Sequence, residues 1–128
     1  MRKPVVLDAS AALAVLYSEP GADRIIDEVQ YAFLGTANLI EVYTKLIVDG
    51  LIADEAWKRI ERLHCTICPV DEEQARLAST MIWATRPFGL SLGDRACIAL
   101  AMQRDAIVYT TDKIWTKLDI GVEIRAIR

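Results

Sequence analysis

The sequence predicts a single α/β domain built around a mainly parallel sheet. Short runs of β-branched and apolar residues alternate with helical patterns from one end of the chain to the other. Strands that are separated by helices of ten or more residues need crossover connections, and such connections make the strands parallel. The 128 residues, of which 53% are hydrophobic, suffice for one hydrophobic core and are too few for two ordinary domains. We therefore treat residues 1–128 as one domain.

The elements of the first half begin with a strand that leads directly into a helix. The β-rich run "VVL" at 5–7 predicts the strand, and the apolar, alanine-rich stretch at 10–19 predicts the helix. Pro20 and Gly21 then break the chain. The remaining elements expected as far as residue 70 are a helix at 22–29, a strand at 31–34, helices at 37–49 and 53–63, and a strand at 66–70.

The second half continues the same alternation. Acidic residues open a helix at 71–85, where negative charge favours the helix N-terminus, and Pro87 and Gly89 mark a loop at 86–90. The last elements expected are a helix from residue 91, a strand at 106–112 and a strand at 122–127. Five strands in all are expected for the sheet.

Composition excludes several classes of protein. No apolar run approaches the roughly 18 to 20 residues of a membrane span, and the apolar stretch near the N-terminus is too short for a secretory signal. Three cysteines make no disulfide framework, and reduced thiols suit a cytoplasmic protein. A net charge of −3 argues against a general nucleic-acid coat, although a local basic rim stays open.

Four acidic residues stand where strands end and helices begin. Asp8 and Asp112 come directly after predicted strands, and Glu41 and Asp94 lie in the first turns of predicted helices. In a parallel sheet, the carboxyl ends of the strands and the helix starts that follow them share one edge, so these four side chains are placed to converge.

Each acid also has a purely structural explanation. Asp8 and Asp112 suit N-caps, and the spacing of "SLGD" and "NLIE" suits capping boxes that end at Asp94 and Glu41. The helical wheel leaves Glu41 on the surface, where Lys45 is placed to pair with it. Asp94 is the exception, because it shares a helical stripe with the small and apolar residues Cys97, Ile98 and Ala101.

Electrostatics decides what convergence of these acids would require. Two carboxylates about 4 Å apart repel by about 4 kcal/mol at an effective dielectric near 20, so gathered acids must be protonated or must hold a cation. A site made only of oxygen ligands suits Mg²⁺ or Mn²⁺ rather than zinc. A bound divalent ion would explain why Asp94 faces inward.

Four segments together resemble the PIN-domain ribonucleases, in particular the VapC-type toxins of type II toxin–antitoxin pairs. They are "VVLDASA" at 5–11, "ANLIEVYTKL" at 37–46, "LSLGDRACIALA" at 91–102 and "YTTDKIW" at 109–115. The resemblance implies that Asp8, Glu41, Asp94 and Asp112 are the catalytic, metal-binding acids. It also implies that Ser10 supports the first acid and that Thr111 supplies a hydroxyl before the last. One departure is that 113–117 lacks the further acid of some relatives, which leaves the number of metal ions open.

The same resemblance implies the rest of the expected biology. The fold would be a three-layer PIN-like one with helices on both faces of the sheet, and the protein would be a homodimer controlled by a cognate antitoxin. Water activated by Mg²⁺ or Mn²⁺ would hydrolyse RNA and leave 5′-phosphate and 3′-hydroxyl ends. Four cations near the acids are candidates for RNA contact: Arg86, Arg95, Lys45 and Lys113.

Two other functions remain open at this point. An α/β phosphohydrolase would use Asp8 as a covalent nucleophile, although such enzymes usually carry a second aspartate where this chain has Ser10. A PIN-like module without activity would bind RNA or protein only. A zinc or redox site at Cys65 and Cys68 is disfavoured, because an offset of three residues in a strand sends the two side chains to opposite faces.

Overall fold

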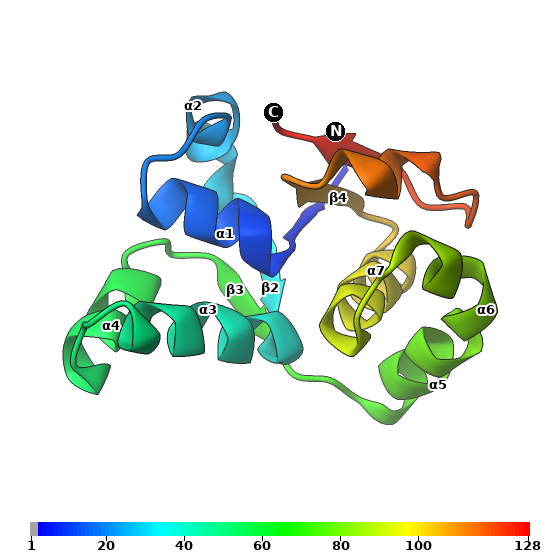
Figure 1. Ribbon diagram of the computed structural model, residues 1–128, viewed down its shortest axis with the longest axis horizontal. Helices are drawn as coiled ribbons and strands as arrows, with labels where there is room; N and C mark the ends of the chain where they lie inside the picture. The colour runs from blue at the N-terminus through cyan, green and yellow to red at the C-terminus, as the bar shows by residue number, and fades with distance from the viewer. Residues whose placement is uncertain (1–2) are drawn as a thin grey trace.

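The computed structural model describes residues 3–128 and is built on one five-stranded parallel sheet (Figure 1). The strand order is β3-β2-β1-β4-β5, and each neighbouring pair is parallel. The strands are β1 (Val5–Leu7), β2 (Phe33–Gly35), β3 (Thr66–Cys68), β4 (Ile107–Thr110) and β5 (Ile124–Ala126). The chain moves outward from β1 to β3 and then returns to the other side of β1, so the topological switch point lies between β1 and β4.

Helices cover both faces of this sheet, as the three-layer fold predicts. Figure 1 shows α1, α3 and α4 grouped apart from α5, α6 and α7. The α-helices are α1 (Ala9–Leu16), α2 (Ala22–Ile25), α3 (Thr36–Val48), α4 (Ala53–Glu61), α5 (Glu72–Thr80), α6 (Ile82–Thr85) and α7 (Leu92–Arg104). Three short 3₁₀ helices complete the chain: η1 (Ile26–Tyr31), η2 (Arg86–Phe88) and η3 (Lys113–Lys117).

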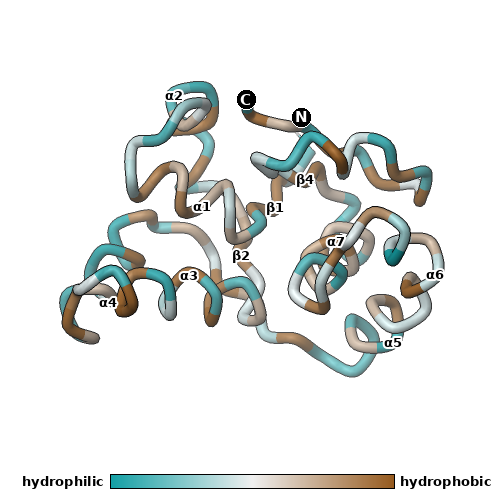
Figure 2. Tube along the Cα trace, in the orientation of Figure 1, coloured by the Kyte–Doolittle hydropathy of each residue, from teal (hydrophilic) through white to brown (hydrophobic). Residues whose placement is uncertain are grey.

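The two faces of the sheet carry separate hydrophobic cores. Leu7 and Leu34 pack with α1, α3 and α4, whereas Val6 and Val108 pack with the buried face of α7. This division follows from the strand period of two, which sends successive side chains to opposite faces. The central strands are therefore apolar on both sides, while α3 and α4 alternate between apolar and polar residues along their length (Figure 2).

Most of the predicted elements are confirmed, and the differences lie at the ends of helices and strands. The predicted helix at 71–85 divides at Met81 into α5 and α6. The predicted helix at 22–29 keeps α-helical geometry only in α2 and continues as η1, and the predicted loop at 86–90 contains η2. The short helix η3 was not anticipated, because its five residues are too few to show a helical period.

The two cysteines of the segment 65–68 pack with different cores. Cys65 packs with the core under α3 and Cys68 with the core under α7, on opposite faces of the sheet, so they do not form a joint site. Within residues 3–128, no helix is long and apolar enough to cross a membrane.

Candidate active site

Asp8 lies at the carboxyl end of β1 and caps the N-terminus of α1. Its carboxylate is 3% exposed and accepts three hydrogen bonds. Oδ1 accepts from the backbone N–H of Ala11 and from Oγ of Ser10, each at 2.7 Å, and Oδ2 accepts from Oγ1 of Thr110 at 2.6 Å. Burial raises the pKa of Asp8 to about 6 although these hydrogen bonds act to lower it. The residue is therefore an N-cap and, at the same time, a buried acid held in one orientation.

A short relay of hydroxyls links Asp8 to the end of β4. Ser10 Oγ accepts from the backbone N–H of Thr111 at 2.9 Å, and Thr110 Oγ1 accepts from the backbone N–H of Asp112 at 3.1 Å. The hydroxyl that contacts the first acid is thus that of Thr110, while Thr111 contributes a backbone N–H. Thr110 is fully buried because it occupies the inward-facing position of the strand.

Glu41 meets the start of α7 at a point where only glycine leaves room for it. Helix α3 contacts α7, and a Cβ atom added at Gly93 would lie 1.8 Å from Oε1 of Glu41. The buried side chain of Asn38 joins the same point, since its Nδ2 donates to Glu41 Oε1 at 3.3 Å and to the carbonyl of Gly93 at 3.2 Å. Asn38 thus lies inside α3, and the capping box predicted to end at Glu41 does not form. The prediction that Glu41 lies in the first turn is also wrong, because α3 begins at Thr36 and places Glu41 in its second turn.

Asp94 forms the predicted capping box and also faces the other acids. Its Oδ2 accepts from the backbone N–H of Ser91 at 2.8 Å, and Ser91 Oγ accepts from the N–H of Asp94 at 3.2 Å. Burial, and then the charge of Asp94, raises the pKa of Glu41, and the charge of Asp94 also acts to raise the pKa of Asp8. Asp8, Glu41 and Asp94 are therefore coupled electrostatically across elements far apart in sequence.

Asp112 lies beside this group without sharing its charge coupling. It caps η3, where Oδ1 accepts from the backbone N–H of Ile114 at 3.1 Å, and the side chain is exposed. Its link to Asp8 runs through Thr110.

The four acids form a suitable donor set without a closed coordination shell. Among residues 3–128, no three His, Cys, Asp or Glu side chains lie close enough together to hold a metal ion. In the same part of the chain, Glu41, Asp94 and Asp112 each use one carboxylate oxygen for a hydrogen bond within the protein, and the second oxygen of each accepts none. Hard oxygen donors with a free oxygen each are the chemistry that Mg²⁺ and Mn²⁺ prefer.

The four cations that were candidates for RNA contact have different surroundings. Lys45 pairs with Asp49 at 3.0 Å and not with Glu41. Arg95 donates to the carbonyl of Ala78 at 2.9 Å and is half-buried, so it serves to hold α7 against α5. The guanidinium of Arg86 stacks 5.7 Å from the ring of Trp83, and Lys113 is exposed beside Asp112.

Three residues of this site were not found from sequence: Asn38, Gly93 and Thr110. Each lies within three residues of an acid that was found, which is a usable signal in retrospect. Asn38 is one helical turn before Glu41, Gly93 precedes Asp94, and Thr110 is two strand positions before Asp112.

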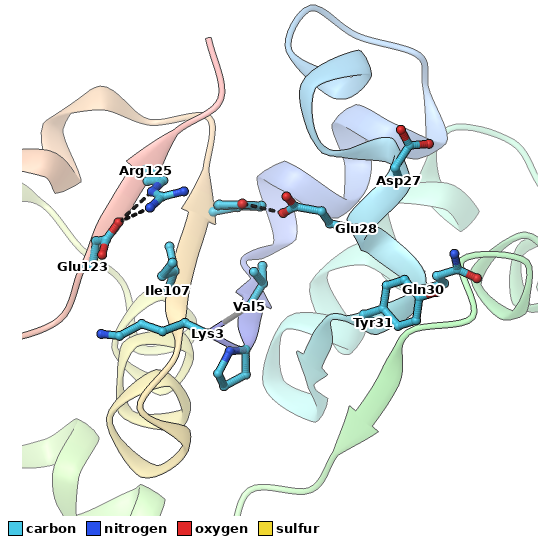
Figure 3. Close-up of a pocket in the computed structure, with 11 residues that line it drawn as sticks. Lys3, Val5, Asp27, Glu28, Gln30, Tyr31, Ile107, Glu123 and Arg125 are labelled. Atoms are coloured by element: carbon cyan, nitrogen blue, oxygen red, sulfur yellow. Dashed lines mark hydrogen bonds and ion pairs between the residues drawn. The ribbon is translucent and has the colours of Figure 1, made fainter. Parts of the chain in front are cut away.

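A cavity away from the acids lies at the other edge of the sheet. Its volume is about 1020 Å³, and Lys3, Val5 and Ile107 place it at the amino ends of β1 and β4 (Figure 3). The hydroxyl of Tyr109 donates to Glu28 across it, and Arg125 pairs with Glu123 at its rim. None of the four acids lines this cavity.

The fold has several solved counterparts. The DNA-bound VapBC complex from Salmonella typhimurium has a chain with 13% sequence identity and a TM-score of 0.76, with 99% of this chain and 100% of that chain covered. A toxin–antitoxin complex from Klebsiella pneumoniae has a chain with 14% identity and a TM-score of 0.72, covering 97% and 98%. A member of the VapBC family of toxin–antitoxin systems from Mycobacterium tuberculosis has a chain with 22% identity and a TM-score of 0.62, covering 99% of each.

Sequence comparison identifies the family. No curated protein matches the chain. The family model of the PIN domain matches residues 5–121. This range contains strands β1 to β4 and all four candidate acids, and it ends just before β5. With the parallel sheet, the acids at its switch point and this match over most of the chain, the protein belongs to the PIN domain family.

Proposed function

We propose that this protein is a Mg²⁺- or Mn²⁺-dependent endoribonuclease and the toxin of a type II toxin–antitoxin pair. The observation that carries the proposal is the electrostatic coupling of Asp8, Glu41 and Asp94 at the switch point of the sheet in a member of the PIN domain family. The charge of Asp94 acts to raise the pKa of both Asp8 and Glu41, and acids gathered in this way destabilise the fold unless a cation neutralises them. Such an arrangement suits binding of a divalent ion.

Asp8, Glu41 and Asp94, with Asp112 beside them, are the residues that would hold the ion. A bound divalent ion supplies charge neutralisation for a phosphodiester and activates water for attack. The chain itself contributes position. Ser10, Thr110 and the N–H of Ala11 hold the Asp8 carboxylate in one orientation, and Asn38 holds Glu41 against Gly93.

The phosphohydrolase alternative fits this geometry less well. A covalent nucleophile must reach its substrate, whereas Asp8 is 3% exposed and both of its carboxylate oxygens already accept hydrogen bonds at 2.6 to 2.7 Å. Ligation of an ion at the edge of the carboxylate demands less access than in-line attack by one of its oxygens.

Site variants test the proposal directly. We expect Asp8→Asn and Asp94→Asn each to abolish cleavage of a panel of RNAs in Mg²⁺ or Mn²⁺, and EDTA to abolish cleavage by the wild type. Asp105→Asn is the matched control, because Asp105 is exposed, pairs with Lys3 and has a left-handed conformation that asparagine tolerates. Undiminished cleavage by both site variants would refute the metal-site proposal.

A second test concerns the partner. Several solved counterparts of the fold are toxin–antitoxin complexes, which supports an antitoxin as partner. We also propose a cytoplasmic homodimer as the working form. A short neighbouring reading frame with a DNA-binding N-terminus would be the candidate antitoxin. We expect expression of the wild type to arrest growth and co-expression of this neighbour to relieve the arrest. Arrest by an Asp94→Asn variant of equal abundance would contradict the assignment.

A further inference from the structure

A smaller cavity of about 390 Å³ adjoins the candidate active site. Ser10 and Thr111, which belong to the hydroxyl relay at Asp8, form part of its wall. The rest of the wall includes Tyr17 from the end of α1, Lys45 from α3 and Arg128 from the segment after β5. The cavity therefore borders the hydroxyl relay that holds Asp8 and extends away from it along α1.

The cations of this cavity are held in exposed, exchangeable pairs. Lys45 pairs with Asp49 at 3.0 Å, and the hydroxyl of Tyr17 donates to the same carboxylate at 2.6 Å. Arg128 pairs with Glu19 at 3.5 Å. The four charged side chains are 35% to 53% exposed. Ion pairs at this exposure contribute little to stability, so Lys45 or Arg128 can leave its carboxylate partner at small cost.

We propose that this cavity is a subsite for one nucleotide of single-stranded RNA, next to the phosphodiester at the acids. The ring of Tyr17 stacks on the base, while Lys45 and Arg128 leave Asp49 and Glu19 to bind backbone phosphate. The inference rests on the proposed function for the identity of the ligand. Tyr17 and Arg128, which had no role in the proposed function, thereby contact the RNA. Of the four candidate cations, Lys45 is the one placed at this subsite.

Three features favour RNA over a protein segment. An aromatic ring beside two cations is the arrangement that single-strand binding sites use for base and phosphate. The volume lies within the ~300 to 1,000 Å³ of sites that take small molecules, which suits one nucleotide rather than a helix. The wall at Ser10 and Thr111 borders the hydroxyl relay at Asp8, so a nucleotide bound in the cavity would lie next to a phosphodiester held at the acids.

The test measures the affinity of a fluorescein-labelled single-stranded RNA oligonucleotide in EDTA, so that binding is read without cleavage. We expect Lys45→Gln and Arg128→Gln each to weaken binding and to reduce the slope of log affinity against log salt by about 0.7, the value for one phosphate contact on a single strand. Lys58→Gln and Arg76→Gln are matched controls, since both residues lie in exposed ion pairs elsewhere. A merely structural role would leave the salt slope unchanged.

Variants of Tyr17 and Asp49 sharpen the test. Tyr17→Ala is expected to weaken binding by roughly 5- to 150-fold, the range for loss of one stacked base, whereas Tyr17→Phe keeps the ring and stays within a few-fold of the wild type. Asp49→Asn releases Lys45 and is expected to strengthen binding more than Glu72→Gln, which removes the same charge from an exposed pair on α5. A gain of affinity at Asp49 is a result that damage to the fold does not produce.

The outcomes separate the subsite from the nuclease. If the wild type cleaves RNA in Mn²⁺ and the Lys45, Arg128 and Tyr17 variants match their controls in affinity and salt slope, the subsite is refuted and the nuclease stands. If the variants lose RNA affinity as expected and the wild type cleaves nothing, the subsite stands and the nuclease is refuted. If the variants lose the co-expressed antitoxin and keep RNA affinity, the cavity binds protein and the proposal is overturned.

Discussion

Gly93→Ala is expected to separate stability from activity. The backbone at Gly93 is ordinary helix, so alanine meets no conformational strain there. The new Cβ would lie 1.8 Å from Oε1 and 3.0 Å from Cδ of Glu41, and ordinary contacts begin at 3.4 Å. The carboxylate must therefore move by at least about 1.6 Å, the difference between 3.4 and 1.8 Å.

The cost of this movement to the fold is small. Alanine favours a helix over glycine by about 0.5 to 1 kcal/mol. Against this gain stands loss of the Asn38–Glu41 hydrogen bond, which is worth about 1 kcal/mol. Glu41 is exposed and free to rotate toward solvent. The free energy of unfolding of Gly93→Ala should therefore lie within about 1 kcal/mol of the wild-type value.

The cost to the site is larger, because the displaced carboxylate is a proposed ligand. Disturbing the immediate surroundings of a metal typically lowers affinity or activity by about 10- to 100-fold, or about 1.4 to 2.7 kcal/mol. We expect a loss of this size in Mn²⁺ affinity by titration calorimetry and in RNA cleavage. Gly35→Ala is the matched control, because its Cβ would meet Leu100 at 3.4 Å and Asn38 at 3.8 Å, both ordinary contacts.

Urea denaturation and calorimetry on the same preparations decide the matter. A Gly93→Ala variant that keeps full Mn²⁺ affinity and cleavage would show that Glu41 does not need its present place. A variant that loses several kcal/mol of stability would show that Glu41 cannot rotate away, and the expected separation of stability from activity would be refuted.

Four other variants have defined expectations. The folded-state pKa of Asp8, about 6, lies above the ordinary aspartate value of about 3.8, so its protonation contributes stability that is fully present below about pH 3.8 and is lost as pH rises through about 6. Without metal, the wild type should thus lose about 3 kcal/mol over this range relative to Asp8→Asn, and parallel urea curves for the two proteins would contradict this. Asn38→Ala should cost about 1 to 3 kcal/mol because it leaves the Gly93 carbonyl without its side-chain donor, and an unchanged urea midpoint would be inconsistent with that role. Gly21→Ala should cost about 3 kcal/mol, since φ is +96° and the Cβ would lie 2.3 Å from the carbonyl oxygen of Ile127. Gly50→Ala, at φ +112° with open space, should cost about 1 kcal/mol, and equal melting temperatures for the two would refute the steric argument.

The strands and long helices were predictable because their signals are local. Val5, Val6 and Leu7 are apolar without alternation, which is typical of a strand buried on both faces, and that is how β1 lies between two cores. Helix ends were less predictable. Met81 interrupts α5 and α6 although no proline or glycine marks the place, because packing beneath it decides the break.

The sequence by itself determined that Asp8 caps a helix and that Ser91 and Asp94 close a capping box at the start of another. These properties depend on residues at most three positions apart. The tertiary structure alone decided which hydroxyl reaches Asp8, since the strand pleat turns Thr110 inward and leaves Thr111 to offer its backbone. It also decided that Lys45 turns to Asp49 and that Glu41 fills the space beside Gly93. Such choices depend on how α3 packs on α7, and no local period in the chain encodes the contact between two helices 50 residues apart.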